Sequence, residues 1–263
     1  MMTTIGAALL GWSMLLPAAA QDRPQPDPQE TEAWAPIPKR VSPGSPTAAP
    51  SDAIVLFGGK DLGEWVSTAS PGKPADWIVA NGAFTVRPGS GNIQSRRLFT
   101  DYQIHLEWRV PATLTGSGQG RGNSGLFLAS TGVDGGYEIQ ILDCADNTTY
   151  ANGQAASIYK QHIPLVNACA APGEWQTYDV IWTAPRFALD GALVSPAYVT
   201  ALHNGVLVQH HVALQGESVY AGKPSYRRHG ALPIKLQDHG DPVSFRNIWV
   251  RPLAAAVAPA AYR

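Results

Sequence analysis

Apolar and polar residues alternate along several short segments of this chain, which is the pattern of half-buried β-strands. Residues 102–110 carry an apolar side chain at every second position, with His, Glu and Arg between them. Residues 137–142 and 178–182 repeat the alternation. We therefore predict a strand in each of these three segments.

Turn residues separate the predicted strands. Asn204-Gly205 lies between the apolar runs 198–202 and 206–208, a strong signal for a two-residue hairpin. Residues 233–236 and 243–250 add two more expected strands, and no segment has the periodicity of an amphipathic helix three turns long. The fold class we predict is all-β, a two-sheet antiparallel jelly-roll sandwich.

The N-terminus reads as a signal peptide over residues 1–20. Its apolar stretch is too short to span a bilayer, and Ala18-Ala19-Ala20 suits a signal peptidase. The absence of Lys and Arg from the first four residues keeps a second interpretation open, an unstructured apolar N-terminus. On the first interpretation the protein is secreted or periplasmic.

The remaining chain divides by composition. Residues 21–50 contain eight prolines and no periodicity, which is typical of a linker or tail. Residues 51–252 hold the expected strands and form the predicted β-sandwich domain, and residues 253–263 are an alanine-rich tail expected to be disordered. A single domain of this length is common among β-sandwiches.

Charge and cysteine content narrow the function classes. The chain has 19 basic and 20 acidic residues in 263, so it has no surplus charge to neutralise nucleic-acid or lipid phosphates. We predict neither nucleic-acid binding nor membrane insertion.

Export would permit a disulfide between Cys144 and Cys169, and two unpaired thiols are the alternative. No His or Cys spacing specifies a metal, so we predict no metal site and no cofactor.

Acids, amides and a histidine fill the polar positions of two predicted strands. A solvated outer face is the ordinary explanation for such positions. The residue types favour a hollow functional surface instead, since a plain solvated face more often carries Lys, Thr and Ser. The polar residues concerned are His105, Glu107, Arg109, Glu138, Gln140 and Asp143.

Glu138-Ile-Gln140-Ile-Leu-Asp143 is the sharpest of these patterns. Glu138 and Gln140 share a face and lie about 6.5 to 7 Å apart along a strand. Asp143 joins that face only if a bulge inserts one residue. With the bulge, two carboxylates can divide the acid and base roles of catalysis. The spacing also resembles the Glu-x-Asp-x-x-Glu strand of laminarinase-type glucanases, from which Gln140 and Asp143 depart.

A second cluster is Gln237-Asp238-His239-Gly240. Here His239 is a candidate general base, because imidazole titrates near neutral pH. The alternative is that Asp238 caps a turn and His239 is simply exposed. In Gly122-Asn123-Ser124-Gly125, Asn123 either belongs to a turn or binds sugar hydroxyls.

Several segments resemble, in the order in which they occur along the chain, the 3-keto-disaccharide hydrolase domain family. This family was long catalogued as a domain of unknown function. The resemblance covers residues 54–251. In its first segment Gly58 stands where the family usually has Asn, and the two cysteines resemble a local addition. The matching segments are LFGGKDLGEW (56–65), HLEWRVP (105–111), GNSGLF (122–127), YEIQILD (137–143), IY (158–159), PLVNA (164–168), PGEWQTYD (172–179), LHNGV (202–206), LQDHG (236–240) and FRNI (245–248).

The resemblance implies a concanavalin-like jelly roll and activity on 3-keto-glycosides, a small-molecule carbohydrate substrate. A ketone at carbon 3 acidifies the proton on carbon 2, so the site needs a base, an acid for the group leaving carbon 1, and donors for the enolate oxygen. The expected catalytic residues are Glu138, Asp143 and His239. The expected substrate-binding residues are Glu107, Arg109, Asn123, Gln140, Lys160, Gln237 and Asp238.

Two other functions fit the same expected fold. One is a non-catalytic carbohydrate-binding module, which needs surface aromatics and no titratable cluster. The other is an ordinary endo-glucanase. The acid, amide and histidine set favours the 3-keto-glycoside enzyme over both.

Overall fold

A computed structural model describes residues 27–45 and 48–254. The expected signal peptide, the beginning of the linker and all but two residues of the expected tail lie outside the described residues. The chain divides into two units, residues 1–39 with 256–263 and residues 40–255. Among the described residues no helix is long and apolar enough to cross a membrane.

The described part of the first unit, residues 27–39, contains one turn of 3-10 helix, η1 (Pro28–Thr31). Asp27 caps it, since its carboxylate accepts a hydrogen bond from the Gln29 amide at 3.0 Å. None of the helical residues is buried.

The second unit begins before Ser51, the residue at which the β-sandwich domain was predicted to begin. Ser42 and Ser51 bond each other twice, through the Ser51 amide to the Ser42 carbonyl and the Ser42 amide to the Ser51 hydroxyl. These bonds tie part of the proline-rich segment to the β-sheet domain, and the second unit begins at Arg40.

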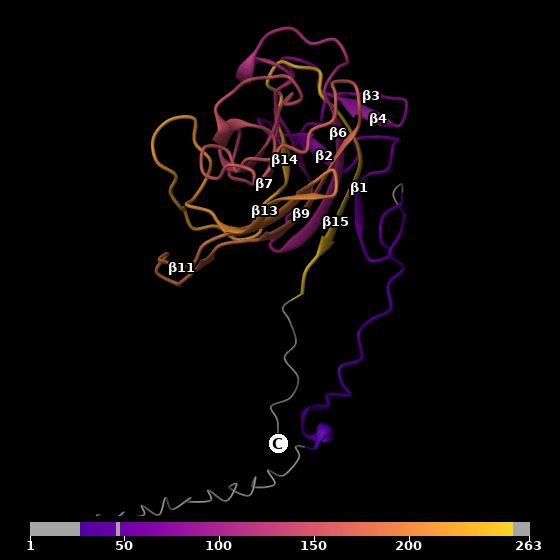
Figure 1. The fold of residues 1–263 in the computed structure, drawn as a ribbon, viewed down its shortest axis with the longest axis vertical. Helices are drawn as coiled ribbons and strands as arrows, with labels where there is room; N and C mark the ends of the chain where they lie inside the picture. Colours follow the sequence, from indigo (N-terminus) through magenta and orange to yellow (C-terminus); the bar gives the residue numbers. More distant parts are fainter. Residues whose placement is uncertain (1–26, 46–47, 255–263) are drawn as a thin grey trace, which may run out of the picture. The chain divides into compact units, whose positions relative to one another are not determined.

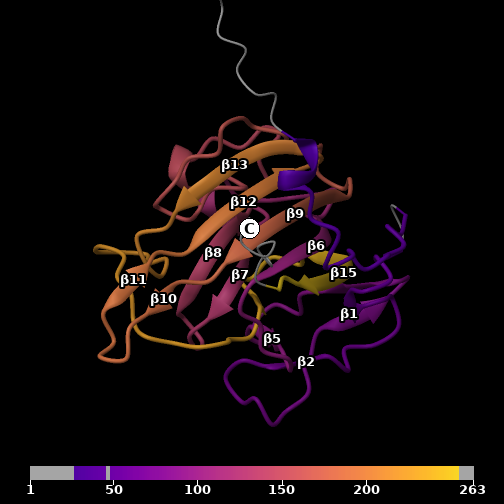
Figure 2. The ribbon, with the colours of Figure 1, turned by 90° about the horizontal axis from the view of Figure 1, so that it is seen from below.

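Within the described residues, the second unit is a sandwich of two antiparallel sheets (Figures 1 and 2). The larger sheet has eight strands in the order β13-β12-β9-β6-β15-β4-β3, with β1 also paired to β15. Its strands are β1 (Ile54–Phe57), β3 (Ile78–Ala80), β4 (Ala83–Thr85), β6 (Tyr102–Arg109), β9 (Gln176–Thr183), β12 (Tyr198–His203), β13 (Val206–Ala213) and β15 (Ser244–Pro252).

The smaller sheet has the order β2-β5-β14-β7-β8, and in Figure 2 β7 and β8 lie behind the strands of the larger sheet. The predicted all-β sandwich is confirmed. The strands are β2 (Trp65–Ser67), β5 (Ile93–Ser95), β7 (Ser124–Ser130), β8 (Gly136–Ile141) and β14 (Lys235–Leu236). A separate hairpin joins β10 (Arg186–Phe187) to β11 (Leu193–Ser195), and the 3-10 turns are η2 (Gly118–Gly120) and η3 (Ala151–Gly153).

The core lies between the two sheets. The apolar side chains of β6 at positions 104, 106 and 108 and those of β8 at 137, 139 and 141 are all buried in one cluster. Burying each aliphatic or aromatic side chain of this size stabilises the fold by about 1.5 to 3 kcal/mol. The predicted Asn204-Gly205 hairpin forms between β12 and β13, with both residues at the positive φ that this turn requires.

Strands β6 and β8 belong to different sheets, so their polar residues face opposite outer surfaces of the sandwich. Glu107 and Arg109 of β6 lie on the outside of the larger sheet, and Glu138 and Gln140 of β8 on the outside of the smaller one. The prediction that these residues share one hollow surface is therefore wrong. Alternation separates inside from outside, but it does not tell which sheet a strand joins.

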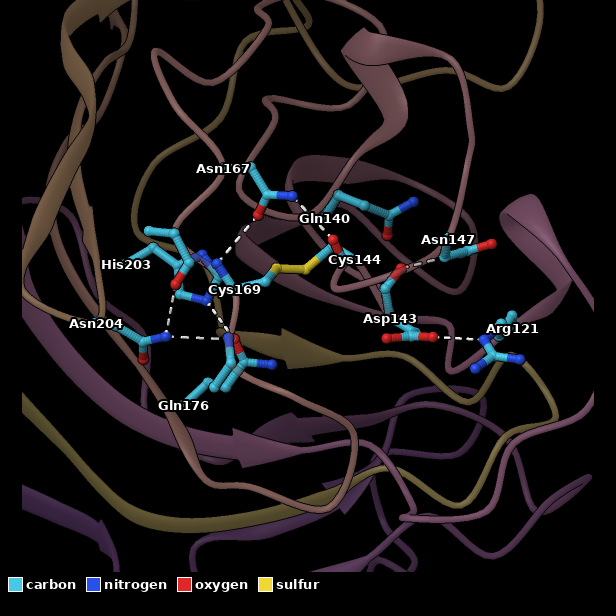
Figure 3. Close-up of a disulfide and its surroundings, with 12 residues drawn as sticks. Arg121, Gln140, Asp143, Cys144, Asn147, Asn167, Cys169, Gln176, His203 and Asn204 are labelled. Atoms are coloured by element: carbon cyan, nitrogen blue, oxygen red, sulfur yellow. Dashed lines mark hydrogen bonds and ion pairs between the residues drawn. A yellow bond between two sulfur atoms is a disulfide. The ribbon is translucent and has the colours of Figure 1, made fainter.

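Cys144 and Cys169 form a disulfide with their Cα atoms 5.9 Å apart (Figure 3). Asn167 braces it, donating its amide to the Cys144 carbonyl at 2.8 Å and accepting the Cys169 amide at 3.0 Å. The bond closes a loop of 25 residues that runs from the end of β8 to the approach to β9.

We predict that replacing both cysteines by serine lowers the free energy of unfolding by about 3 kcal/mol, because the unfolded chain regains the entropy of this loop. Denaturant unfolding of the wild type and the Cys144→Ser/Cys169→Ser variant measures the difference. A reductant should destabilise the wild type and leave the double variant unchanged; equal midpoints for the two proteins would contradict the prediction.

Candidate functional site

A cavity of about 660 Å³ opens on the outer face of the smaller sheet. Strands β7 and β8 supply its floor, and the loops around residues 119–123, 133–134, 150–160, 218–220 and 237–239 supply its walls. Of the residues predicted for the site, Asn123, Glu138, Gln140, Lys160, Gln237, Asp238 and His239 line it. The other lining residues are Asn92, Gln119, Phe127, Val133, Asp134, Tyr150, Tyr159, Ser218, Val219 and Tyr220.

The register of the smaller sheet sets the floor. Lys235 of β14 pairs with Phe127 of β7, which pairs with Glu138 of β8, so the three side chains form one row on the outer face. The neighbouring row, Leu236, Leu126 and Ile139, points into the core. Core burial of that second row therefore directs the first row toward the cavity side.

Glu138 is a buried acid on the floor of the cavity, with only 6% of its surface exposed. Burial raises the pKa of its carboxyl group to about 8, and the positive charge of Lys235 opposes that rise. Gly125 lies against it, where a Cβ atom would come within 2.6 Å of Glu138 Oε1. At neutral pH Glu138 therefore holds a proton and can serve as a general acid.

The amide side chains beside Glu138 form a connected network. Gln140 donates from Nε2 to Gln119 Oε1 at 2.8 Å, and Gln119 donates to the Thr149 hydroxyl and the Gly153 carbonyl. Asn123 donates to the Gln119 carbonyl at 2.7 Å. Gln140 and Gln119 thus hold each other and the loop at η3.

Two side-chain amide oxygens of residues that line the cavity have no hydrogen-bond partner among the described residues. Asn123 Oδ1 and Gln237 Oε1 are both buried without a hydrogen bond. A buried acceptor without a donor costs about 1 to 3 kcal/mol. Both residues line the cavity, which makes their side-chain amides candidates for binding the hydroxyl groups of a ligand.

A cation and three tyrosines form the opposite wall. Lys160 Nζ lies 4.4 Å from the ring centre of Tyr220 and 5.5 and 5.6 Å from those of Tyr150 and Tyr159. The ammonium also donates to the Tyr220 carbonyl, and the Tyr150 and Tyr159 hydroxyls are 2.8 Å apart. Lys160 has a positive φ of 58° and its amide donates to the Asn152 carbonyl at 2.7 Å. The backbone of the disulfide-closed loop thus presents the lysine to the cavity.

The loop after β14 brings His239 to the cavity. Asp238 accepts the amides of Gly91 and Gly240 at 2.9 and 3.0 Å, one on each carboxylate oxygen, so it acts as the turn cap that the sequence allowed. His239 is exposed and lines the cavity. The imidazole is therefore an exposed group of this loop at the cavity.

Asp143 does not line the cavity. Strand β8 ends at Ile141, so Asp143 lies beyond the paired residues of β7 and β8. Its buried carboxylate instead pairs with Arg121, with Nε and Oδ2 2.5 Å apart (Figure 3). The structure does not support the predicted acid–base role of Asp143.

Glu107 and Arg109 also lie away from this cavity, on the outer face of the larger sheet. Glu107 accepts from Arg246 Nε at 2.6 Å and from the Asn247 amide at 2.9 Å, beside a separate pocket of about 290 Å³. The Arg109 guanidinium lies 4.6 Å from the ring centre of Trp175. Neither can contact a ligand bound at Glu138, so their predicted substrate-binding role is not supported at this site.

Several aromatic residues of the floor and walls were not predicted from the sequence. Phe127 was hidden because it lies in an unbroken apolar run, and Tyr150 and Tyr220 lie in loops without periodicity. Lys235 carried a usable signal, a lysine between two apolar residues of a short predicted strand.

Comparisons with known proteins identify the family of the chain. The profile of the family described as "3-keto-alpha-glucoside-1,2-lyase-like domain" matches residues 52–251. A curated relative from Bacteroides thetaiotaomicron, named 3-keto-disaccharide hydrolase, is 26% identical over 76% of this chain and 78% of its own.

Two solved structures from Parabacteroides distasonis, each described as a "putative glycosyl hydrolase", are also similar. One is 47% identical, with a TM-score of 0.80 over 86% of this chain and 97% of the other. The second, 20% identical with a TM-score of 0.57 over 77% and 94% of the two chains, shares the fold. The family profile covers most of the chain and includes every residue that lines the cavity. The chain therefore belongs to the family of 3-keto-alpha-glucoside-1,2-lyase-like domains.

Proposed function

We propose that this protein cleaves the glycosidic bond of 3-keto-glycosides, including 3-keto-disaccharides, by elimination followed by addition of water. The observation that carries the proposal is the buried Glu138, whose pKa burial raises to about 8, on the floor of a cavity that an imidazole, an ammonium group and two side-chain amides also line. The names of the relatives support the same substrate class.

The chemistry needs a base at carbon 2. In this proposal His239 takes the proton from carbon 2, which the ketone at carbon 3 has acidified, and the electron pair moves toward the ketone oxygen. The ammonium of Lys160 stabilises the negative charge that develops on that oxygen. Asn123 and Gln237 accept hydrogen bonds from the hydroxyl groups of the sugar and fix its orientation.

The second half of the reaction needs an acid at carbon 1. As the enolate returns to a ketone, a double bond forms between carbons 1 and 2 and the bond from carbon 1 to the leaving oxygen breaks. Glu138 gives its proton to that oxygen. Water then adds across the double bond, with the hydroxyl on carbon 1 and a proton on carbon 2, so that the net reaction is hydrolysis.

We also propose that the protein is exported from the cytoplasm. The Cys144–Cys169 disulfide supports a secreted or periplasmic location, because structural disulfides persist in oxidising compartments.

A substrate panel separates this activity from its alternatives. We expect release of free sugar from 3-keto-trehalose or 3-keto-lactose and none from unoxidised glucan, because only the ketone acidifies the carbon 2 proton. Chromatography of the products measures both. Cleavage of the glucan alone would identify an endo-glucanase, and binding without turnover would identify a carbohydrate-binding module; either result overturns the proposal.

Removing the acid or the base should lower turnover strongly. We predict that Glu138→Gln and His239→Ala each reduce kcat on a 3-keto-disaccharide by about 10²- to 10⁴-fold, the usual contribution of a positioned acid or base. Glu174→Gln and His210→Ala change the same residue types at exposed positions outside the cavity and serve as matched controls. Full activity in both cavity variants would mean that the reaction occurs elsewhere.

The pH dependence follows from the raised pKa of Glu138. The acid must be protonated to act, so kcat/KM should fall as the pH rises through about 8, where Glu138 loses its proton. A pH profile of the wild type tests this, with Glu138→Gln expected to lose that alkaline limb. A wild-type profile that stays flat to pH 10 would rule out Glu138 as the acid.

A further inference from the structure

Lys235 is a lysine with no solvent exposure beside the cavity, and the proposed reaction does not use it. Its ammonium donates three hydrogen bonds, to the carbonyls of Gly132, Val133 and Gly135, at 3.0, 2.9 and 2.8 Å. All three belong to the turn between β7 and β8. One side chain thus satisfies most of the carbonyls of that turn.

Glycines shape this turn and its exit into β8. Gly132 has a φ of 134° and Gly136, the first residue of β8, a φ of 136°, conformations that other residues rarely adopt. The turn lines the cavity with Val133 and Asp134. The lysine binds it from the buried side and holds those two residues in place.

The lysine also supports the floor. Its Nζ atom lies 3.8 Å from the ring centre of Phe127, a cation–π contact, and Phe127 lines the cavity. Lys235 itself does not line the cavity. Its ammonium group therefore acts on the cavity through Phe127 and the turn.

Asn92 extends the support to the histidine loop. Its amide donates to the Val133 carbonyl at 2.9 Å, the same oxygen that Lys235 binds, and its Oδ1 accepts the Asp238 amide at 2.9 Å. The turn that Lys235 fixes is thus connected to the residue next to His239.

The charges around Lys235 are acidic. Glu138, Asp134 and Glu217 all act on its ammonium, and Glu217 is itself paired with Arg227 at 3.1 Å. Among the described residues no carboxylate lies in salt-bridge contact with Lys235. Its positive charge is therefore not cancelled by a direct partner and acts on the floor where Glu138 lies.

We propose that Lys235 is a positioning residue of this site, which fixes the 132–135 turn and the Phe127 ring and places a positive charge on the same face of the sheet as Glu138. The catalytic part of this inference rests on the function proposed above. The structural and electrostatic parts do not, because they concern a turn and a titration that exist without substrate.

Three substitutions separate the two effects. Lys235→Met removes the charge and the donors, Lys235→Gln removes the charge and keeps amide donors, and Lys235→Arg keeps both. Lys73→Met, at an exposed position, is the control. Lys235→Gln also carries the charge test should Lys235→Met not fold, as judged by circular dichroism.

The first readout needs no turnover. Hydrogen exchange of the backbone amides of residues 131–136 should quicken at least tenfold in Lys235→Met and less in Lys235→Gln. Isotope-edited infrared titration of Glu138, identified by its loss in Glu138→Gln, should show a higher pKa in both uncharged variants, since Lys235 lowers that pKa in the wild type. Unchanged exchange together with an unchanged Glu138 titration would overturn the inference, whatever the activity.

The second readout is kinetic. On a 3-keto-disaccharide we expect kcat to fall about tenfold to a hundredfold in Lys235→Met, with the alkaline limb of the pH profile moved upward and a partial recovery in Lys235→Arg. If the wild type turns over no 3-keto-glycoside, the proposed function fails while the exchange and titration results still decide the role of Lys235. A wild-type kcat and pH profile in Lys235→Met would refute its role in catalysis.

Discussion

The alternation of residues in the smaller sheet is the constraint on which the rest of the structure depends. Leu126, Ile139 and Leu236 meet the larger sheet in the core, and their burial prevents a one-residue slip of β7, β8 or β14. Each neighbouring residue must then face the other way. The acid and the buried lysine therefore owe their positions to the apolar residues next to them in the chain.

That arrangement sets the electrostatics of the cavity. Phe127 lies between Lys235 and Glu138 in the row of paired residues, so that an apolar ring separates a buried cation from a buried acid. Low polarity keeps the acid protonated, while the cation limits how far its pKa rises. The pKa of Lys235 is shifted as well. Burial lowers it to about 8, and the negative charge of Glu138 opposes that fall. Removing the charge of either group would therefore shift the pKa of the other.

Much of the fold could be predicted from the sequence, because period-two alternation and the Asn204-Gly205 turn depend on local chemistry. The relation of Glu138 to Gln140 followed from the same period. The position of Glu107 and Arg109 on the larger sheet could not be predicted in this way, because strands of both sheets show the same alternation. Asp143 was misplaced because it lies beyond the end of β8, where its ion pair with Arg121 and not the strand period holds its side chain.

The residues of the cavity walls that could be predicted were those with recognisable chemistry, such as the imidazole of His239 and the ammonium of Lys160. Tyr150 and Tyr220 come from loops whose paths depend on contacts far away in the sequence, such as that between Lys160 and the Tyr220 carbonyl. Propensity and periodicity carry no information on such contacts. The carbonyl bonds of Lys235 likewise depend on how a remote turn folds back on β14.

The disulfide has one more consequence for this wall. Tyr150, Tyr159 and Lys160 all lie between Cys144 and Cys169, inside a covalent ring. If a protease cuts the backbone once anywhere in that ring, the sulfur bridge still joins the two pieces, and the severed ends remain tethered to the sandwich. Peptide-bond breakage there would appear as two fragments only after reduction.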